Sequence, residues 1–186
     1  EDVETSIAEV LLGTAPITDA IVISDEGLNL VPATIGLAAA EESLVSKTGR
    51  EQRLRVSLAN VADDYDWILI DCPPALGVLT VGSLSAADEV IIPLQAETLS
   101  HRGVGQLLDT IHDVRQFINP DLKIRGVLAT MYDGRTSHAR TVLAAIEETY
   151  ELDVLEPPIP KTIRFAEAPA IGRSILSTAT RHKGAE

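Results

Sequence analysis

Short apolar runs alternate with helical patterns along the 186 residues of the chain. Apolar residues recur at helical spacing over Ser6–Leu12, and the pattern ends at Gly13, a residue that commonly stops a helix. Residues 28–31 form a short strand candidate, and residues 35–62 predict one or two helices with polar faces. The first third of the chain is therefore expected to be mainly helical.

The rest of the chain contains stronger strand signals. Trp67–Ile70 and Val90–Ile92 are continuous apolar runs, which are typical of strands buried on both faces, and Ile124–Met131 is a third strand. The remaining predicted elements are helices at Val78–Ala87, Gly103–Ile118 and Ser137–Tyr150, with Ser137 as the N-cap of the last, and a short strand at Val154–Leu155.

Strands and helices that alternate through long connections predict right-handed βαβ crossovers. The expected fold class is α/β, with a doubly wound, mostly parallel sheet. Such sheets place their chemistry in the loops at the carboxyl ends of the strands, here Asp71–Pro74, Tyr132–Thr136 and Pro157–Arg164. No linker-like segment divides the chain, so we expect residues 1–186 to form a single domain.

Composition restricts the class of protein. Hydrophobic residues make up 45% of the chain and aromatic residues 3%, so aliphatic side chains must build the core. A single cysteine, Cys72, excludes an internal disulfide and suits a reducing compartment; we expect its small side chain to be buried. No apolar run reaches the roughly 18 residues that a membrane span needs, and the acidic start is no signal peptide. These features predict a cytoplasmic protein.

The net charge of −13 is unevenly distributed along the chain. Residues 1–100 contain 17 acidic and 4 basic side chains, whereas residues 101–186 contain 11 of each. A local basic face that binds phosphates is therefore compatible with the second part, because such binding depends on the local field. Scattered, solvated surface charges are the simpler interpretation of the same counts.

Asp71 is the strongest candidate for chemistry. It follows the apolar run Trp67–Ile70, where a carboxylate at the end of a buried strand faces the ligand crevice of a parallel sheet. Carboxylate oxygens are suitable ligands for Mg²⁺ or for one of its waters. Pro73 and Pro74 stiffen the next turn, so a shift at the site can move the following helix. The alternative is that Asp71 merely ends a strand.

Several segments together resemble the ParA/Soj partition ATPases, a family of deviant-P-loop NTPases. The matching segments are Leu28–Arg53, Ile68–Pro74, Ala87–Pro93, Thr130–Thr136 and Ile159–Pro169. The resemblance covers nearly the whole chain and implies a P-loop NTPase sheet and an ATP-gated homodimer that requires Mg²⁺. It further implies binding to non-specific DNA, stimulation of hydrolysis by a ParB-type partner, and a nucleoid-associated role in chromosome or plasmid segregation without a membrane.

The chain also departs from this family. It contains no Gly-Lys dipeptide, so it has no P-loop of the G-x-x-x-x-G-K-[ST] kind. The family's N-terminal phosphate loop and the strand after it have no counterpart, and the usual final helix is missing. We therefore expect the sequence to be incomplete at its N-terminus and its C-terminus. The 186-residue chain alone should not hydrolyse ATP, whereas the full-length protein should be an ATP hydrolase.

By resemblance, four residues belong to the nucleotide site. Asp71 matches the second acidic residue of the magnesium site, and Met131 lies at the strand end expected near the base. Pro160 and Thr162 match the segment that lines the adenine, although the family more often has Arg-Asn in place of Lys161 and Thr162. Met131 is equally compatible with a role as a core residue.

Arg135 and Arg164 match the arginines that contact DNA phosphates in the family. The guanidinium is a fixed, permanently charged donor suited to phosphate oxygens, although each arginine alone is also typical of an ordinary surface charge. Two other functions remain open. One is a MinD-like ATPase that acts on a membrane through a C-terminal amphipathic helix. The other is a non-catalytic interaction module that retains only the fold.

Overall fold

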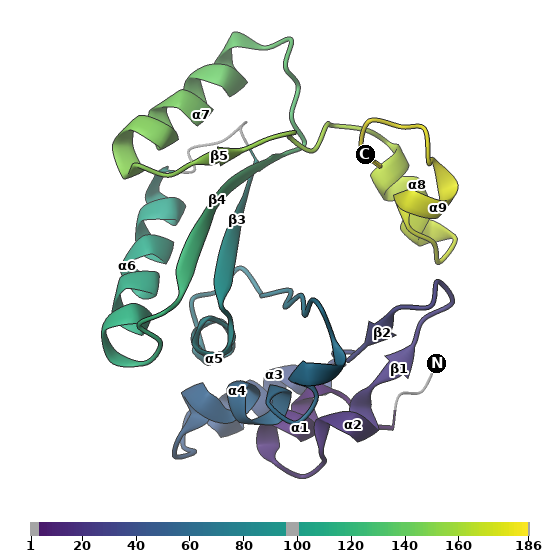
Figure 1. Cartoon of the computed structure of the whole chain (residues 1–186), viewed down its shortest axis with the longest axis vertical. Helices are drawn as coiled ribbons and strands as arrows, with labels where there is room; N and C mark the ends of the chain where they lie inside the picture. Colours follow the sequence, from purple (N-terminus) through teal and green to yellow (C-terminus); the bar gives the residue numbers. More distant parts are fainter. Residues whose placement is uncertain (1–3, 96–100, 186) are drawn as a thin grey trace. The chain divides into compact units, whose positions relative to one another are not determined.

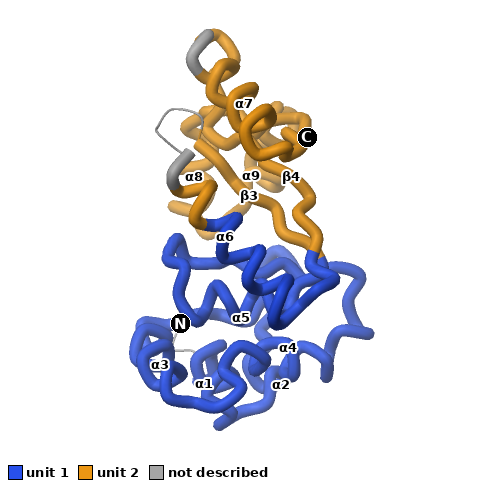
Figure 2. Tube along the Cα trace, turned by 90° about the vertical axis from the view of Figure 1, so that its left-hand side faces the viewer, with its two compact units in different colours: residues 1–88, 107–122 blue, residues 89–106, 123–186 orange. Residues whose placement is uncertain are grey.

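The computed structural model describes residues 4–95 and 101–185. The chain forms two compact units (Figure 2). Unit 1 contains Glu1–Asp88 and Leu107–Leu122, and unit 2 contains Glu89–Gln106 and Lys123–Glu186. Helix α6 (His101–Phe117) contributes its first residues to unit 2 and its remainder to unit 1.

Unit 1 begins with helix α1 (Ile7–Leu12), whose two ends are specified by the local sequence. Ser6 and Glu9 form a capping box: the Ser6 hydroxyl accepts from the amide of Ala8 at 3.2 Å, and the Glu9 carboxylate accepts from the amide of Ser6 at 2.9 Å. The helix ends at Gly13, whose φ of 78° is in the left-handed region that glycine adopts without steric cost. The predicted first helix is confirmed.

Unit 1 also contains a small antiparallel sheet and several short helices (Figure 1). Strand β2 (Asn29–Leu30) confirms the predicted strand near residue 30 and pairs with β1 (Val22–Ile23). The helices are α2 (Ile17–Ala20), α3 (Gly36–Leu44), α4 (Arg53–Leu58) and α5 (Val78–Ala86), with 3₁₀ turns η1 (Arg50–Gln52) and η2 (Ala62–Asp64). Buried aliphatic side chains of unit 1, those of α1 included, form two clusters, Val10/Ile17/Ala20/Val61 and Leu11/Leu44/Leu54.

The predicted strand at Trp67–Ile70 is wrong for this structure. None of the described strands pairs with these residues, which are in no regular element. Trp67 and Leu69 are 82% and 90% exposed, and only Ile70 packs against the cluster around Leu44. An apolar run becomes a buried strand only where neighbouring strands take up its backbone hydrogen bonds and other layers cover its faces. Neither condition holds here.

Unit 2 is built on a three-stranded parallel sheet in the order β3-β4-β5 (Figure 1). Its strands are β3 (Glu89–Gln95), β4 (Lys123–Thr130) and β5 (Val154–Leu155). Ile92 of β3 lies opposite Val127 of β4, and both are buried. The predicted α/β fold class with a parallel sheet is confirmed.

One glycine permits the close approach of β5 to β4. Gly126 has a φ of 148°, and a Cβ at this position would lie 2.5 Å from the carbonyl oxygen of Asp153. Any larger residue would push β5 away from the sheet. The segment that follows β5, which carries several of the predicted site residues, is therefore positioned by this contact.

Helix α7 (Ser137–Tyr150) follows β4, and helices α8 (Arg164–Ala170) and α9 (Ile175–Thr178) follow β5. The N-cap of α7 is Thr136 rather than the predicted Ser137: the Thr136 hydroxyl accepts from the amide of Ala139 at 3.4 Å. No helix in the described residues is long and apolar enough to cross a membrane.

Candidate functional site

The first part of the site lies where β3 and β4 end. Gln95 pairs with Thr130, the residue before Met131, and the Gln95 side-chain amide donates to the Met131 sulfur at 3.2 Å. Met131 has a φ of 47°, which residues other than glycine seldom adopt, and it is 53% exposed. Met131 is therefore a surface residue at a strand end and not a core residue, and its contact with a nucleotide stays a prediction.

The backbone links Met131 directly to the segment that contains Pro160. The amide of Tyr132 donates to the carbonyl of Ile159 at 2.9 Å, and the amide of Lys161 donates to the carbonyl of Tyr132 at 3.1 Å. These two bonds form a parallel bridge between Tyr132 and Pro160. Two of the predicted nucleotide contacts, Met131 and Pro160, therefore belong to adjacent, hydrogen-bonded segments.

Thr162 lies two residues beyond this bridge, at the start of α8. Its hydroxyl accepts from the amide of Arg164 at 3.3 Å, which satisfies one of the free amides at the beginning of the helix. Thr162 thus has a structural role of its own, beside the predicted role at the adenine.

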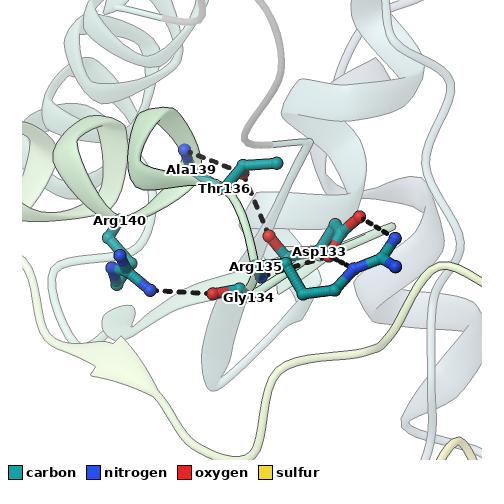
Figure 3. Close-up of polar contacts among 6 residues, drawn as sticks. All are labelled: Asp133, Gly134, Arg135, Thr136, Ala139 and Arg140. Carbon is teal, nitrogen blue, oxygen red and sulfur yellow. Dashed lines mark hydrogen bonds and ion pairs between the residues drawn. The ribbon is translucent and has the colours of Figure 1, made fainter.

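The loop that follows Met131 contains a charged pair (Figure 3). The guanidinium of Arg135 donates to both carboxylate oxygens of Asp133, with Nε–Oδ1 at 2.9 Å and Nη2–Oδ2 at 2.7 Å. The Arg135 side chain is 90% exposed, whereas that of Asp133 is 26% exposed. Hydrogen bonds from the Arg135 side chain lower the pKa of Asp133 to about 2, so Asp133 is ionised under ordinary conditions.

Other hydrogen bonds fix the backbone of this loop (Figure 3). The amide and the hydroxyl of Thr136 donate to the carbonyl of Asp133 at 3.1 and 3.0 Å. Arg140 in the first turns of α7 donates to the carbonyl of Gly134 at 2.8 Å. The loop therefore has a defined path from the end of β4 to the start of α7, and Arg135 projects from it into solvent.

Arg164 also has an acidic partner. Its Nη1 lies 2.9 Å from Oε2 of Glu167, one helical turn further along α8, with both side chains more than half exposed. Each of the two predicted DNA-binding arginines thus forms an ion pair with a carboxylate two or three residues away in the sequence. Sequence reasoning missed Asp133 and Glu167, although an acidic residue three positions from an arginine on a helix is a recognisable pairing signal.

Asp71 belongs to unit 1, whereas Met131, Pro160, Thr162 and the two arginines belong to unit 2. The Asp71 side chain is exposed and has no polar partner among the described residues. A carboxylate available on the surface fits a magnesium ion that takes its other ligands from phosphates and water. The described part of the chain contains no group of three or more His, Cys, Asp or Glu side chains that could hold a metal ion.

The turn after Asp71 departs from the prediction at one residue. Cys72 is exposed, not buried, because the segment around it has no covering layer. The following turn is fixed by Thr80, a 5% exposed residue of α5 whose hydroxyl donates to the carbonyl of Ala75 at 2.6 Å. The turn beyond Pro74 is therefore tied to α5, and the transmission of a shift from the site to that helix stays a prediction.

Comparison with known proteins gives consistent results. A sequence profile of an AAA domain family (AAA_31) matches residues 1–124. The sporulation initiation inhibitor protein Soj of Bacillus subtilis is 41% identical over 186 residues, which cover 100% of this chain and 74% of Soj. The chromosome partitioning protein ParA of Myxococcus xanthus is 41% identical over 187 residues, which cover 100% of this chain and 66% of ParA. The chain belongs to the ParA/Soj family.

A solved structure supports the same fold for this ParA/Soj-family chain. The structure named cobyrinic acid a,c-diamide synthase from Mycobacterium smegmatis, with a bound ATP analogue and magnesium, is 48% identical. It matches with a TM-score of 0.83 over 97% of this chain and 75% of its own. The fold is thus that of the P-loop ATPases, as predicted.

The ParA/Soj relatives are longer than this chain, which spans about two thirds to three quarters of their length. Family membership supports an ATP hydrolase and a nucleotide-magnesium cofactor in general terms. The individual roles of Asp71, Met131, Pro160, Thr162, Arg135 and Arg164 stay predictions.

Proposed function

We propose that the protein is an ATP-gated partition ATPase that binds non-specific DNA as a homodimer and releases it on hydrolysis. In this proposal a ParB-type partner stimulates hydrolysis, and the protein works on the nucleoid in the cytoplasm to segregate a chromosome or plasmid. One observation carries the proposal: the backbone bridge between Tyr132 and Pro160 joins the predicted nucleotide segments to the loop of Arg135.

The nucleotide side of the proposal rests on exposed apolar groups at the end of the sheet. Met131 is half exposed and Pro160 is partly exposed, and flat apolar or polarisable groups suit the faces of a purine. Asp71 would hold Mg²⁺ or one of its waters. When bound, magnesium-ATP supplies the transferable phosphoryl group, and this chain's contribution is to orient it and to hold the cation.

The DNA side rests on Arg135 and Arg164. Both extend from segments that leave the carboxyl end of the same parallel sheet, and both are mostly exposed. Residues 101–186 carry balanced charge, unlike the acidic residues 1–100, so this part of the chain can present positive charge to phosphates. Contacts to phosphates alone give binding without sequence preference.

The bridge supplies a physical path for gating. A base that presses on Met131 or Pro160 acts on two segments that are hydrogen-bonded to each other. The loop of Arg135 begins one residue after Met131, and α8 with Arg164 begins shortly after Pro160. A small displacement at the base would therefore move both arginines, because each follows one of these two hydrogen-bonded segments within a few residues.

The test is DNA binding by the full-length protein with ATP, with ADP and without nucleotide, each with Mg²⁺. We expect tight binding to duplexes of unrelated sequence with ATP only, and a steep fall in affinity with salt as counterions are released. Met131→Ala should raise the ATP concentration needed for DNA binding, whereas the exposed Leu176→Ala on α9 serves as a matched control. Equal DNA binding with ATP and ADP would contradict the proposal.

A second candidate function is suggested by the M. smegmatis structure, which is named a cobyrinic acid a,c-diamide synthase. An amide-forming enzyme needs a nitrogen donor and a carboxylic acid substrate besides ATP. The full-length protein should therefore be incubated with cobyrinic acid, ATP, Mg²⁺ and ammonium or glutamine. We expect no diamide product by mass spectrometry; product formation that requires ATP would favour the synthase.

A further inference from the structure

The guanidinium group with which Arg135 would bind a DNA phosphate is already bound to the carboxylate of Asp133. Asp133 accepts from Nε and Nη2 at 2.9 and 2.7 Å, a bidentate geometry that a phosphate group can equally occupy (Figure 3). The pair as a whole has no net charge. A phosphate that approaches Arg135 must therefore displace the carboxylate, or bind beside a fixed negative charge.

The backbone of the loop that carries Arg135 does not depend on the negative charge of Asp133. Thr136 and Arg140 fix the loop through the carbonyls of Asp133 and Gly134, and Tyr132 is fixed by its bridge to Pro160. One further bond runs from the Arg135 amide to Oδ1 of Asp133 at 3.1 Å. An asparagine offers an oxygen at the same position, so this bond does not require the negative charge.

We propose that Asp133 is an internal competitor of the DNA phosphate for Arg135, and that it sets the strength and the salt dependence of DNA binding. The inference rests on the proposed function and concerns the regulation of its DNA site. Because the pair is exposed, the competition is modest and reversible. The Asp133 carboxylate neutralises the charge of Arg135 in the free protein. It thereby lowers the affinity for DNA and makes dissociation faster.

The test compares wild type, Asp133→Asn and Arg135→Ala with the double variant that carries both changes. The full-length, ATP-bound protein is titrated with a non-specific duplex at several salt concentrations. We expect Asp133→Asn to bind about two- to fivefold more tightly at low salt. Its plot of log affinity against log salt should be steeper by up to about 0.9, which corresponds to one additional phosphate contact.

Two further variants control for trivial causes. Asp133→Ser also removes the charge and retains an oxygen that can accept from the amide two residues on, so it should reproduce the effect. Glu148→Gln removes the same charge from an exposed site on α7, roughly 16 Å along the helix from Ser137. This distance exceeds the screening length of about 8 Å at physiological salt, so Glu148→Gln should leave DNA binding unchanged.

The effect must also depend on Arg135. In the Arg135→Ala background, Asp133→Asn should change DNA affinity by less than about 1.5-fold, because the two residues act as one unit. If both Asp133 variants bind DNA as weakly as wild type or more weakly, while Arg135→Ala still weakens binding, the role of Asp133 is overturned and the proposed function is not. Failure of the ATP-bound wild type to bind DNA would overturn this inference together with the proposed function.

Discussion

The loop Tyr132–Thr136 and the segment Asp71–Pro74 both follow apolar runs, yet they differ in how they are held. The loop continues a strand that has neighbours, and its path is defined by a hydrogen bond that the Ile159 carbonyl accepts from Tyr132 and by bonds that Thr136 and Arg140 donate. The segment continues an apolar run without any described strand beside it, and Trp67 and Leu69 are almost fully exposed. Thr80 fixes only its far end.

This difference shows that an apolar run specifies a strand only together with its neighbours. Val90–Ile92 and Trp67–Ile70 have the same pattern in the sequence, but only the first has a partner strand in the structure. Burial and pairing are properties of the assembled sheet, so periodicity alone cannot supply them. The predicted functional residues share this difference, because Asp71 of unit 1 is on the poorly supported segment and Arg135 of unit 2 is on the well supported loop.

The largest effect is expected at Asp71, and it tests whether the poorly supported segment is functional. Asp71→Ala in the full-length protein should lower the ATP turnover rate on the order of 100-fold or more and change nucleotide affinity far less. The reason is that the carboxylate and its cation act on charge that develops in the transition state. Steady-state turnover beside nucleotide titration measures both quantities. Unchanged turnover would remove Asp71 from the site.

The next largest effect concerns the well supported loop. Arg135→Glu together with Arg164→Glu should weaken DNA binding by the ATP-bound full-length protein at least about tenfold, because two phosphate contacts become repulsive. Basal ATP turnover without DNA should persist. A salt titration against wild type measures the effect, and equal affinity with equal salt slope would mean that both arginines are ordinary surface charges.

The sequence predicted the helices and strands better than the side-chain contacts of the candidate site. The end of α1 at Gly13 was predicted from the sequence, whereas the capping box of Ser6 and Glu9 was found only in the structure, although both signals are local. The strands β3 and β4 could be predicted from their apolar runs. The pairing of Asp133 with Arg135 was missed because it depends on the turn that brings the two side chains together, and the exposure of Trp67 depends on distant neighbours.

A smaller effect tests the far end of the segment after Asp71. Thr80→Val removes the hydroxyl that donates to Ala75 and nearly preserves the side-chain volume. The free energy of unfolding should fall by about 1 kcal/mol, the typical contribution of one such hydrogen bond. Urea denaturation of the 186-residue chain measures this change. Thr178→Val on the exposed surface is the control. An equal fall in the free energy of unfolding for this variant would show that the buried hydrogen bond of Thr80 adds no more stability than an exposed one.

The smallest effect is the pH dependence of the Asp133–Arg135 pair. The pKa of Asp133 is lowered from 3.8 to about 2, so the pair is complete above pH 3.8 and is lost only as the pH falls through about 2. The ratio of DNA affinities between wild type and Asp133→Asn should therefore stay constant from about pH 5 to about pH 8. A ratio that changes across this range would mean that another group titrates at the loop.

The central claim is that the nucleotide segments and the DNA loop are coupled through the bridge between Tyr132 and Pro160. Thermodynamic linkage requires that if ATP strengthens DNA binding relative to ADP, DNA strengthens ATP binding relative to ADP by the same factor. The decisive measurement is the affinity of the full-length protein for a non-hydrolysable ATP analogue and for ADP, with and without saturating non-specific duplex. We predict that DNA raises the affinity for the ATP analogue but not that for ADP. Identical nucleotide affinities with and without DNA would contradict the account.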